Sequence, residues 1–293
     1  MRLKLLLSFI LIIYFSGHAL ARDVIIYKQR SSSRIIATSS DGSNNRVIQS
    51  DAIDFTVSPD ASKMIVFHNG CLDKDSCKLT LYDLKKATVK NIVSSHADWY
   101  SGKWISNEEF YVTRQVRSDG IRRACGDGDE LKGCAVRAIL QTATFDFNSC
   151  RFTIVKNLGV GDYEALNREF PLEQEEDIPS LSYNQRYSLM WLGSEYWTKT
   201  LVVRDKDINR DSALFKRKPR DFAEHYHYYE MPWSSDSRLF VLEYYPGGFL
   251  YTIFSGEKKI MVVDRTSLKK RIIGKGSKPY WLPIFPDTFI EQP

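Results

Sequence analysis

Apolar and polar positions alternate in short runs along most of the chain, and polar turns separate the runs. Four segments contain an apolar run, an aspartate, a polar turn and a second β-prone run: LTLYDLKKATVKNIV, TATFDFNSCRFTIV, TLVVRDKDINRDSALF and KIMVVDRTSLKKRII. Four others have a second shape in common: FTVSPDASKMIVFH, GKWISNEEFYVTRQ, IPSLSYNQRYSLMWLG and MPWSSDSRLFVLEYY. Alternation with a period of two predicts β-strands joined in hairpins.

The two kinds of segment follow one another in strict order, which makes the chain a repeat. The aspartates of the first kind recur at intervals of 63, 59 and 59 residues; they are Asp83, Asp146, Asp205 and Asp264. One hairpin of each kind gives a unit of four antiparallel strands. Repeats of this length and content are typical of β-propeller blades, so we expect an all-β protein with a β-propeller fold.

The two ends of the chain complete the count of blades. The segments DVIIYKQ, SRIIATS and NNRVIQS supply three strands before the first unit, and SKPYWLPIF supplies one after the last. If they share one blade, no edge strand is left open, and five four-stranded blades result. A sixth blade is the alternative, hidden in EYWTKTLVVRD or in residues 157–177. We interpret residues 157–177 as a long acidic insertion loop with a short helix at Tyr163–Glu169, inside a single domain of residues 22–293.

Two of the turns resemble those of a known family. SPDASKMIVF and SSDSRLFVLEY are similar to the Ser-Pro-Asp-Gly-Lys turn and strand of TolB-like propeller repeats, which are distantly related to WD repeats. This resemblance implies the propeller fold for most of the chain. TolB carries an α/β domain before its propeller and works with a peptidoglycan-associated lipoprotein. Here strands begin at DVIIYKQ without such a domain, so the resemblance extends to the fold and not to the role of TolB.

The N-terminus has the pattern of a secretory signal peptide. Arg2 and Lys4 precede an apolar run, Leu5 to Phe15, and Ala19-Leu20-Ala21 offers a cleavage site. The run is shorter than the roughly 20 residues that span a bilayer. We therefore expect a cleaved signal peptide at residues 1–21, with an uncleaved anchor as the alternative. There is no lipobox and no later transmembrane segment, which predicts a periplasmic or secreted protein.

The cysteines fit an oxidising compartment. Cys71 and Cys77 bracket LDKDS, and Cys125 and Cys134 bracket GDGDELKG, so the spacing favours the disulfides Cys71–Cys77 and Cys125–Cys134. Other pairings stay open, because spacing alone does not fix connectivity. Cys150 is then a free thiol or a cross-link to another chain. Zinc is a weak alternative, because no CxxC spacing occurs.

Charge and motifs exclude several functions. The formal net charge is +5, and loss of Arg2 and Lys4 lowers it to +3, so we expect no nucleic-acid partner. The chain has no G-x-S-x-G, no H-E-x-x-H and no phosphate-binding glycine loop, and we expect no cofactor.

Carboxylates lead three predicted innermost strands and would converge on one mouth of a central channel. They are Asp54, Asp177 and Glu230, with Asp98 as a further candidate. Glycosidases on five-bladed propellers use carboxylates placed in this way, one as base or nucleophile and one as acid. Two other interpretations stay open: the carboxylates bind a cation, or they only surround a water-filled entrance.

The segment EHYHYYE has the most unusual local composition. In an extended backbone His225 and His227 project to the same side, as ligands of a metal would, with Glu224 or Glu230 as a third ligand. We favour a ligand-binding patch of His225, His227, Tyr228 and Glu230 over a metal site, and ordinary packing is the remaining alternative.

These observations favour a non-enzymatic binding propeller that presents loops and one channel mouth to an envelope or extracellular protein, a peptide or a small ligand. Sequestration of a toxic compound, as self-protection, is one form of this hypothesis. The alternatives are a secreted glycoside hydrolase that uses Asp54, Asp177 and Glu230, and an assembly component cross-linked through Cys150.

Overall fold

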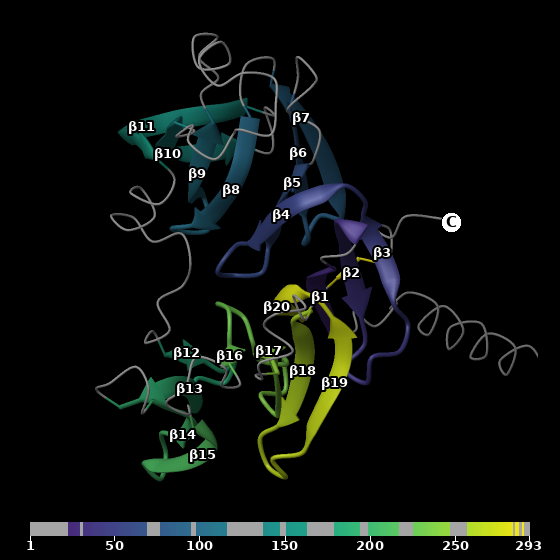
Figure 1. Ribbon diagram of the computed structural model, residues 1–293, viewed down its shortest axis with the longest axis vertical. Coiled ribbons are helices and arrows are strands. Elements are labelled where there is room, and N and C mark those ends of the chain that lie inside the picture. Colours follow the sequence, from purple (N-terminus) through teal and green to yellow (C-terminus); the bar gives the residue numbers. More distant parts are fainter. Residues whose placement is uncertain are drawn as a thin grey trace, which may run out of the picture.

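The computed structural model describes residues 23–29, 32–68, 77–94, 98–115, 137–146, 151–162, 179–193, 199–216, 225–246, 257–283, 285–286 and 289. These residues form five four-stranded antiparallel sheets. Figure 1 shows the sheets following one another around the molecule in chain order. The predicted all-β propeller is thereby confirmed, and the residues described here contain no sixth sheet.

Each sheet is ordered from an innermost to an outermost strand. The first is β20 (Ser277–Leu282), β1 (Val24–Gln29), β2 (Arg34–Thr38) and β3 (Arg46–Gln49). The second is β4 (Ala52–Val57), β5 (Lys63–His68), β6 (Cys77–Asp83) and β7 (Thr88–Ser94). The third is β8 (Asp98–Trp104), β9 (Glu109–Gln115), β10 (Arg137–Asp146) and β11 (Arg151–Asp162). The fourth is β12 (Ser180–Leu181), β13 (Tyr187–Leu192), β14 (Thr200–Asp205) and β15 (Arg210–Lys216). The fifth is β16 (His225–His227), β17 (Leu239–Tyr245), β18 (Lys259–Asp264) and β19 (Lys270–Lys275).

The two ends of the chain meet in the first sheet, as the pattern predicts. Strand β20 pairs antiparallel with β1, so that Tyr280 lies opposite Ile26 and Leu282 opposite Val24. The last strand of the chain is therefore the innermost strand of the sheet that the first three begin. This pairing satisfies the backbone of β1 along an edge that would otherwise be open.

The repeated turn has one geometry in three sheets. Ser58 Oγ donates to Asp60 Oδ1 over 2.8 Å, and the pairs Ser182–Asn184 and Ser234–Asp236 repeat the contact at 2.8 and 2.6 Å. The next residue in each turn, Ala61, Gln185 or Ser237, has a φ between 54 and 58°. The Ser-Pro-Asp-Gly-Lys turn that these segments resemble has glycine there, because glycine adopts this left-handed conformation without strain. In this protein the side-chain hydrogen bonds stabilise the turn, although the residue at this position is not glycine.

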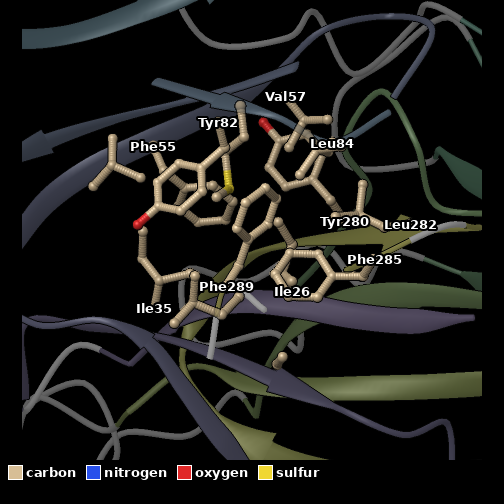
Figure 2. Packing of buried hydrophobic residues seen from close by; sticks show 14 of the residues in the cluster. Ile26, Ile35, Phe55, Val57, Tyr82, Leu84, Tyr280, Leu282, Phe285 and Phe289 are labelled. Carbon is tan, nitrogen blue, oxygen red and sulfur yellow. The ribbon is translucent and has the colours of Figure 1, made fainter. Parts of the chain in front are cut away.

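A core of buried side chains joins the first two sheets to the C-terminal residues. Phe55, Tyr82 and Tyr280 pack in one cluster with Phe285 and Phe289. The rings of Phe289 and Tyr82 meet edge to face, with centroids 5.2 Å apart. Figure 2 shows Phe285 and Phe289 lying among these side chains, between residues of the first sheet and residues of the second. The residues that follow β20 thus extend the contact between the two sheets.

Two elements differ from the prediction. Residues 157–162 do not begin an insertion loop; they continue β11, with Asp162 opposite Arg137 and Asn157 opposite Gln141. The two glycines in NLGVGD suggested a loop, but pairing with the start of β10 satisfies this backbone and outweighs their weak strand propensity. Residues 163–177, with the predicted helix, lie outside the described residues.

The innermost strand of the fifth sheet begins earlier than predicted. Strand β16 is His225–His227, and MPWSS contributes only an isolated bridge between Trp233 and Phe240. Pro232 has no N–H to donate to a ladder, although its carbonyl accepts from Val241 N at 2.8 Å. The carbonyl of Met231 accepts from Trp281 N in β20 at 2.7 Å. This segment therefore bonds to two sheets and belongs to no long ladder.

Candidate functional site

A cavity of about 320 Å³ lies among the innermost strands of four sheets. It is the place where side chains far apart in the sequence converge. Strands β4, β8, β16 and β20 all contribute to the wall, together with part of β17 and the residue before β18. The lining residues are Thr56, Gly102, Lys103, His225, Tyr226, His227, Tyr229, Glu230, Glu243, Tyr245, Lys258, Lys278 and Tyr280.

Strand β16 brings two histidines to the cavity. His225 and His227 are half-buried and Tyr226 between them is buried, as alternation along a strand requires. The Tyr226 ring stacks on Phe215 with centroids 3.7 Å apart, which anchors the strand to the fourth sheet. The edge of the His227 ring meets Tyr229 at 4.6 Å. Because Tyr226 packs against the fourth sheet, His225 and His227 on the other side of the strand face the cavity.

The predicted binding patch of His225, His227, Tyr228 and Glu230 is divided by the structure. The two histidines and Glu230 line the cavity. Tyr228 is 2% exposed and packs in the core cluster with Trp233. Tyr229 takes its place in the wall. The sequence carried this signal, because a period of two that starts at His225 and His227 reaches Tyr229 and not Tyr228.

Lys278 and Asp54 form an ion pair beside the cavity. Lys278 Nζ lies 2.7 Å from both carboxylate oxygens of Asp54, whose side chain is 9% exposed. Lys278 has a φ of 53°, and the pairing register of β20 with β1 shifts at this point. Such a bulge redirects a side chain at the cost of local strain. Here it accompanies a lysine that reaches from the first sheet to the second.

Glu243 is a buried carboxylate whose two oxygens both have partners. Oε1 lies 2.5 Å from Lys258 Nζ. Oε2 accepts from the Tyr229 hydroxyl and from the Lys278 backbone N–H, each at 3.0 Å. Glu243 does not stand out in the sequence, because one glutamate in the apolar run FVLEYY looks like an ordinary strand residue. Its signal was a lone carboxylate within a buried strand, which requires partners from other elements.

Glu230 differs from Glu243, because its Oε2 is buried without a hydrogen-bond partner among the described residues. Tyr280, which is buried, lies beside it. Burial raises the pKa of the Tyr280 hydroxyl well above its usual value, and the charge of Glu230 raises that pKa further. Tyr280 therefore keeps its proton near neutral pH.

The other predicted site residues do not line the cavity or are not described. Asp54 stands next to the cavity but is not among the residues that line it, and Asp177 lies outside the described residues. Asp98 begins β8, and its side chain is not described. Cys71, Cys125, Cys134 and Cys150 also lie outside, and of Cys77 only its backbone place in β6 is described. The disulfides and the free thiol therefore stay predictions.

In the part of the chain that the structure describes, no group of three or more His, Cys, Asp and Glu side chains is placed to hold a metal ion. Within the same residues, no helix has both the length and the apolar content needed to cross a membrane.

No family model and no curated protein matches the chain. Among solved structures, TolB from Acinetobacter baumannii is 12% identical with a TM-score of 0.28; the match covers 89% of this chain and 55% of TolB. An acylaminoacyl peptidase from Pyrococcus horikoshii is 11% identical with a TM-score of 0.31, over 85% of this chain and 37% of that one. The periplasmic gluconolactonase of Pseudomonas aeruginosa is 11% identical with a TM-score of 0.33, over 87% of this chain and 83% of that one.

The chain spans less than two thirds of the first two of these proteins. At such identities the likeness concerns the fold alone. The chain is a β-propeller protein, and its activity has to be argued from its own cavity.

Proposed function

We propose that this protein is a non-enzymatic binding propeller of the periplasm or the secreted space, and that it holds a small polar ligand or a peptide segment in the central cavity. One observation carries the proposal: aromatic and charged side chains from four sheets converge on a cavity of about 320 Å³. Ligand sites are typically concave, of this order of volume or larger, and combine aromatic surface with a few placed polar groups.

The walls of the cavity are held before any ligand arrives. His227 packs on Tyr229, and the Tyr229 ring lies 5.7 Å from Tyr280. Tyr280 in turn meets Phe55 edge to face at 5.3 Å. These contacts link the fifth, first and second sheets. A preorganised wall loses little conformational entropy on binding, which favours affinity.

The paired carboxylates support binding over catalysis. Both oxygens of Asp54 contact Lys278, and both oxygens of Glu243 have donors. They hold the walls and are not presented to a reacting group. The glycosidase hypothesis needs two of the carboxylates Asp54, Asp177 and Glu230 close together, and since Asp177 lies outside the described residues the hypothesis stays a prediction. Sequestration of a toxic compound remains one form of the binding proposal.

A thermal-shift screen tests the proposal. The compounds are neutral sugars, short peptides and divalent cations, with candidate envelope proteins in a parallel binding assay. A ligand that binds only the native state raises its melting temperature, by an amount that grows with concentration. We expect His225→Ala and His227→Ala to lose the shift. Lys206→Ala, at an exposed turn in the fourth sheet, is the matched control and keeps it. A compound that stabilises all four proteins equally binds elsewhere and contradicts the proposal, as does a screen without any hit.

A further inference from the structure

The charged side chains of the cavity wall fall into two groups. Among the residues that the structure describes, they are Lys103, Glu230, Glu243, Lys258 and Lys278. Lys258 is paired with Glu243, and Lys278 with Asp54 behind the wall. Each of these pairs brings a positive and a negative charge into contact, so neither presents a net charge to a ligand. Recognition by charge then depends on Lys103 and Glu230.

Lys103 and Glu230 take part in no ion pair within 4.0 Å among the described residues. Lys103 is half-buried on β8, next to Gly102. A Cβ at Gly102 would lie 2.6 Å from the Tyr111 carbonyl oxygen and 2.9 Å from the Phe67 ring, so only glycine lets this part of β8 pack so closely. Glycine at this position therefore allows the close packing that sets where Lys103 lies in the wall.

Glu230 presents the opposite charge from the fifth sheet. It follows β16, and its Oε2 is buried without a donor among the described residues. A carboxylate oxygen in this state loses hydration without compensation, which costs free energy. The terminal torsion of a glutamate is broad, so the carboxylate can turn this oxygen toward the cavity when a donor arrives. A cationic donor would give the strongest such hydrogen bond.

We infer that the ligand is an extended zwitterion, and specifically a short peptide with free termini. Its carboxylate would bind Lys103 and its ammonium group Glu230. This inference rests on the proposed function and names the ligand of that same cavity. Lys103 and Glu230 come from different sheets. Lys103 belongs to the third sheet and Glu230 follows the innermost strand of the fifth, and these two sheets do not follow one another around the propeller. The ligand therefore has to reach from one to the other, which suits the separated ends of a peptide better than two charges on one carbon. The rings of His227 and Tyr229 add aromatic surface beside the ammonium position.

Isothermal titration calorimetry with four compounds tests this inference. Trialanine carries both charges, N-acetyl-trialanine lacks the ammonium, trialanine amide lacks the carboxylate, and maltotriose is neutral. We expect trialanine to bind at least about tenfold more tightly than either capped peptide, because each cap removes a charge-assisted hydrogen bond. Maltotriose should bind more weakly than all three.

Two variants assign the charges to residues. In Glu230→Gln, acetylation of the peptide should no longer weaken binding, while amidation still should. In Lys103→Gln the reverse should hold. Lys206→Gln, outside the cavity, should behave as the wild type. Because Glu230 is partly buried, each variant is first checked for a cooperative melting transition, and the four-compound comparison on the wild type decides the question if a variant fails to fold.

The outcomes separate the two proposals. Capped peptides that bind as tightly as trialanine would overturn the zwitterion inference and leave the binding proposal in place. Preferential binding of maltotriose would do the same. If none of the four binds and the wider screen also finds nothing, both proposals fail.

Discussion

Lys278 Nζ contacts both carboxylate oxygens of Asp54 at 2.7 Å, although the two residues are separated by 224 positions in the chain. Lys278 lies in β20, the last strand, and Asp54 in β4, the innermost strand of the second sheet. The contact exists only because β20 joins the first sheet beside β1. The ion pair can therefore form only when β20 is paired with β1 in the first sheet.

Substitution of Lys278 should destabilise the protein. In Lys278→Met, the buried carboxylate of Asp54 loses its cation, and we expect the free energy of unfolding to fall by about 2–3 kcal/mol. This loss is smaller than for a fully buried pair, because the Lys278 side chain is 30% exposed. Urea unfolding at neutral pH measures the effect.

The double variant Asp54→Asn/Lys278→Met should recover part of that loss, because no unpaired charge remains. Lys85→Met is the matched control: Lys85 pairs with Asp60, but it is 63% exposed, and its loss should stay below about 1 kcal/mol. Equal losses in Lys85→Met and Lys278→Met would contradict the role given to the buried pair.

Asp60, in the turn between β4 and β5, should make stability depend on pH. Burial alone would raise its pKa, but hydrogen bonds from Ser62, Ser58 and Lys85 together outweigh burial and lower the pKa to about 2. A lowered pKa contributes stability above the unfolded value, near 3.8, and this contribution is lost as the pH falls toward 2.

The variant Asp60→Asn should keep the turn, because Asn184 makes the same contacts in the fourth sheet. It should lose the pH dependence that Asp60 provides. Between pH 6 and pH 3, the stability advantage of the wild type over Asp60→Asn should shrink by about 0.5 kcal/mol, which is roughly half of the unscreened linkage value because Asp60 is largely exposed. Urea unfolding at both pH values measures this. An advantage that grows as the pH falls would contradict the assignment.

The fold was readable from the sequence because each unit carries its own local signals. Alternation places Ile25 and Ile65 in buried strands, and the Ser-x-Asp or Ser-x-Asn turns fix where one hairpin in each of three sheets reverses. The shared first sheet followed from counting strands at the two ends. The end of β11 was not readable, because residues 157–162 are held by pairing with β10, a contact that local propensity does not encode.

The site was readable only in part. His225 and His227 stood out by composition, and both line the cavity. Glu243 and Lys103 did not stand out, since each is an ordinary residue in a strand pattern. Glu243 is notable for its contacts with residues of other elements, and Lys103 for its lack of an ion pair among the described residues. Neither property can be read from the spacing of residues along the chain. Tyr228, which also stood out by composition, lies in the core cluster with Trp233.

The cysteine hypothesis predicts two disulfides and one free thiol per mature chain. Mass spectrometry of the denatured, unreduced and alkylated protein should find one alkylated cysteine, at Cys150, and peptides linked as Cys71–Cys77 and Cys125–Cys134. The same spectrum of the exported protein should place its N-terminus at Arg22. Three or more alkylated cysteines would contradict the predicted oxidising compartment, and a disulfide-linked dimer would support the assembly hypothesis.

The central claim is that ligand binds in the cavity beside β16, and the imidazole signals of the histidines test it most directly. His68 is an internal control, since it is buried in the second sheet with Nε2 2.7 Å from the Thr80 hydroxyl. In a two-dimensional NMR titration with trialanine, or with the compound that gives the largest thermal shift, the signals of His225 and His227 should move with saturation while those of His68 stay in place. Saturable binding that leaves both His225 and His227 unmoved would contradict the account.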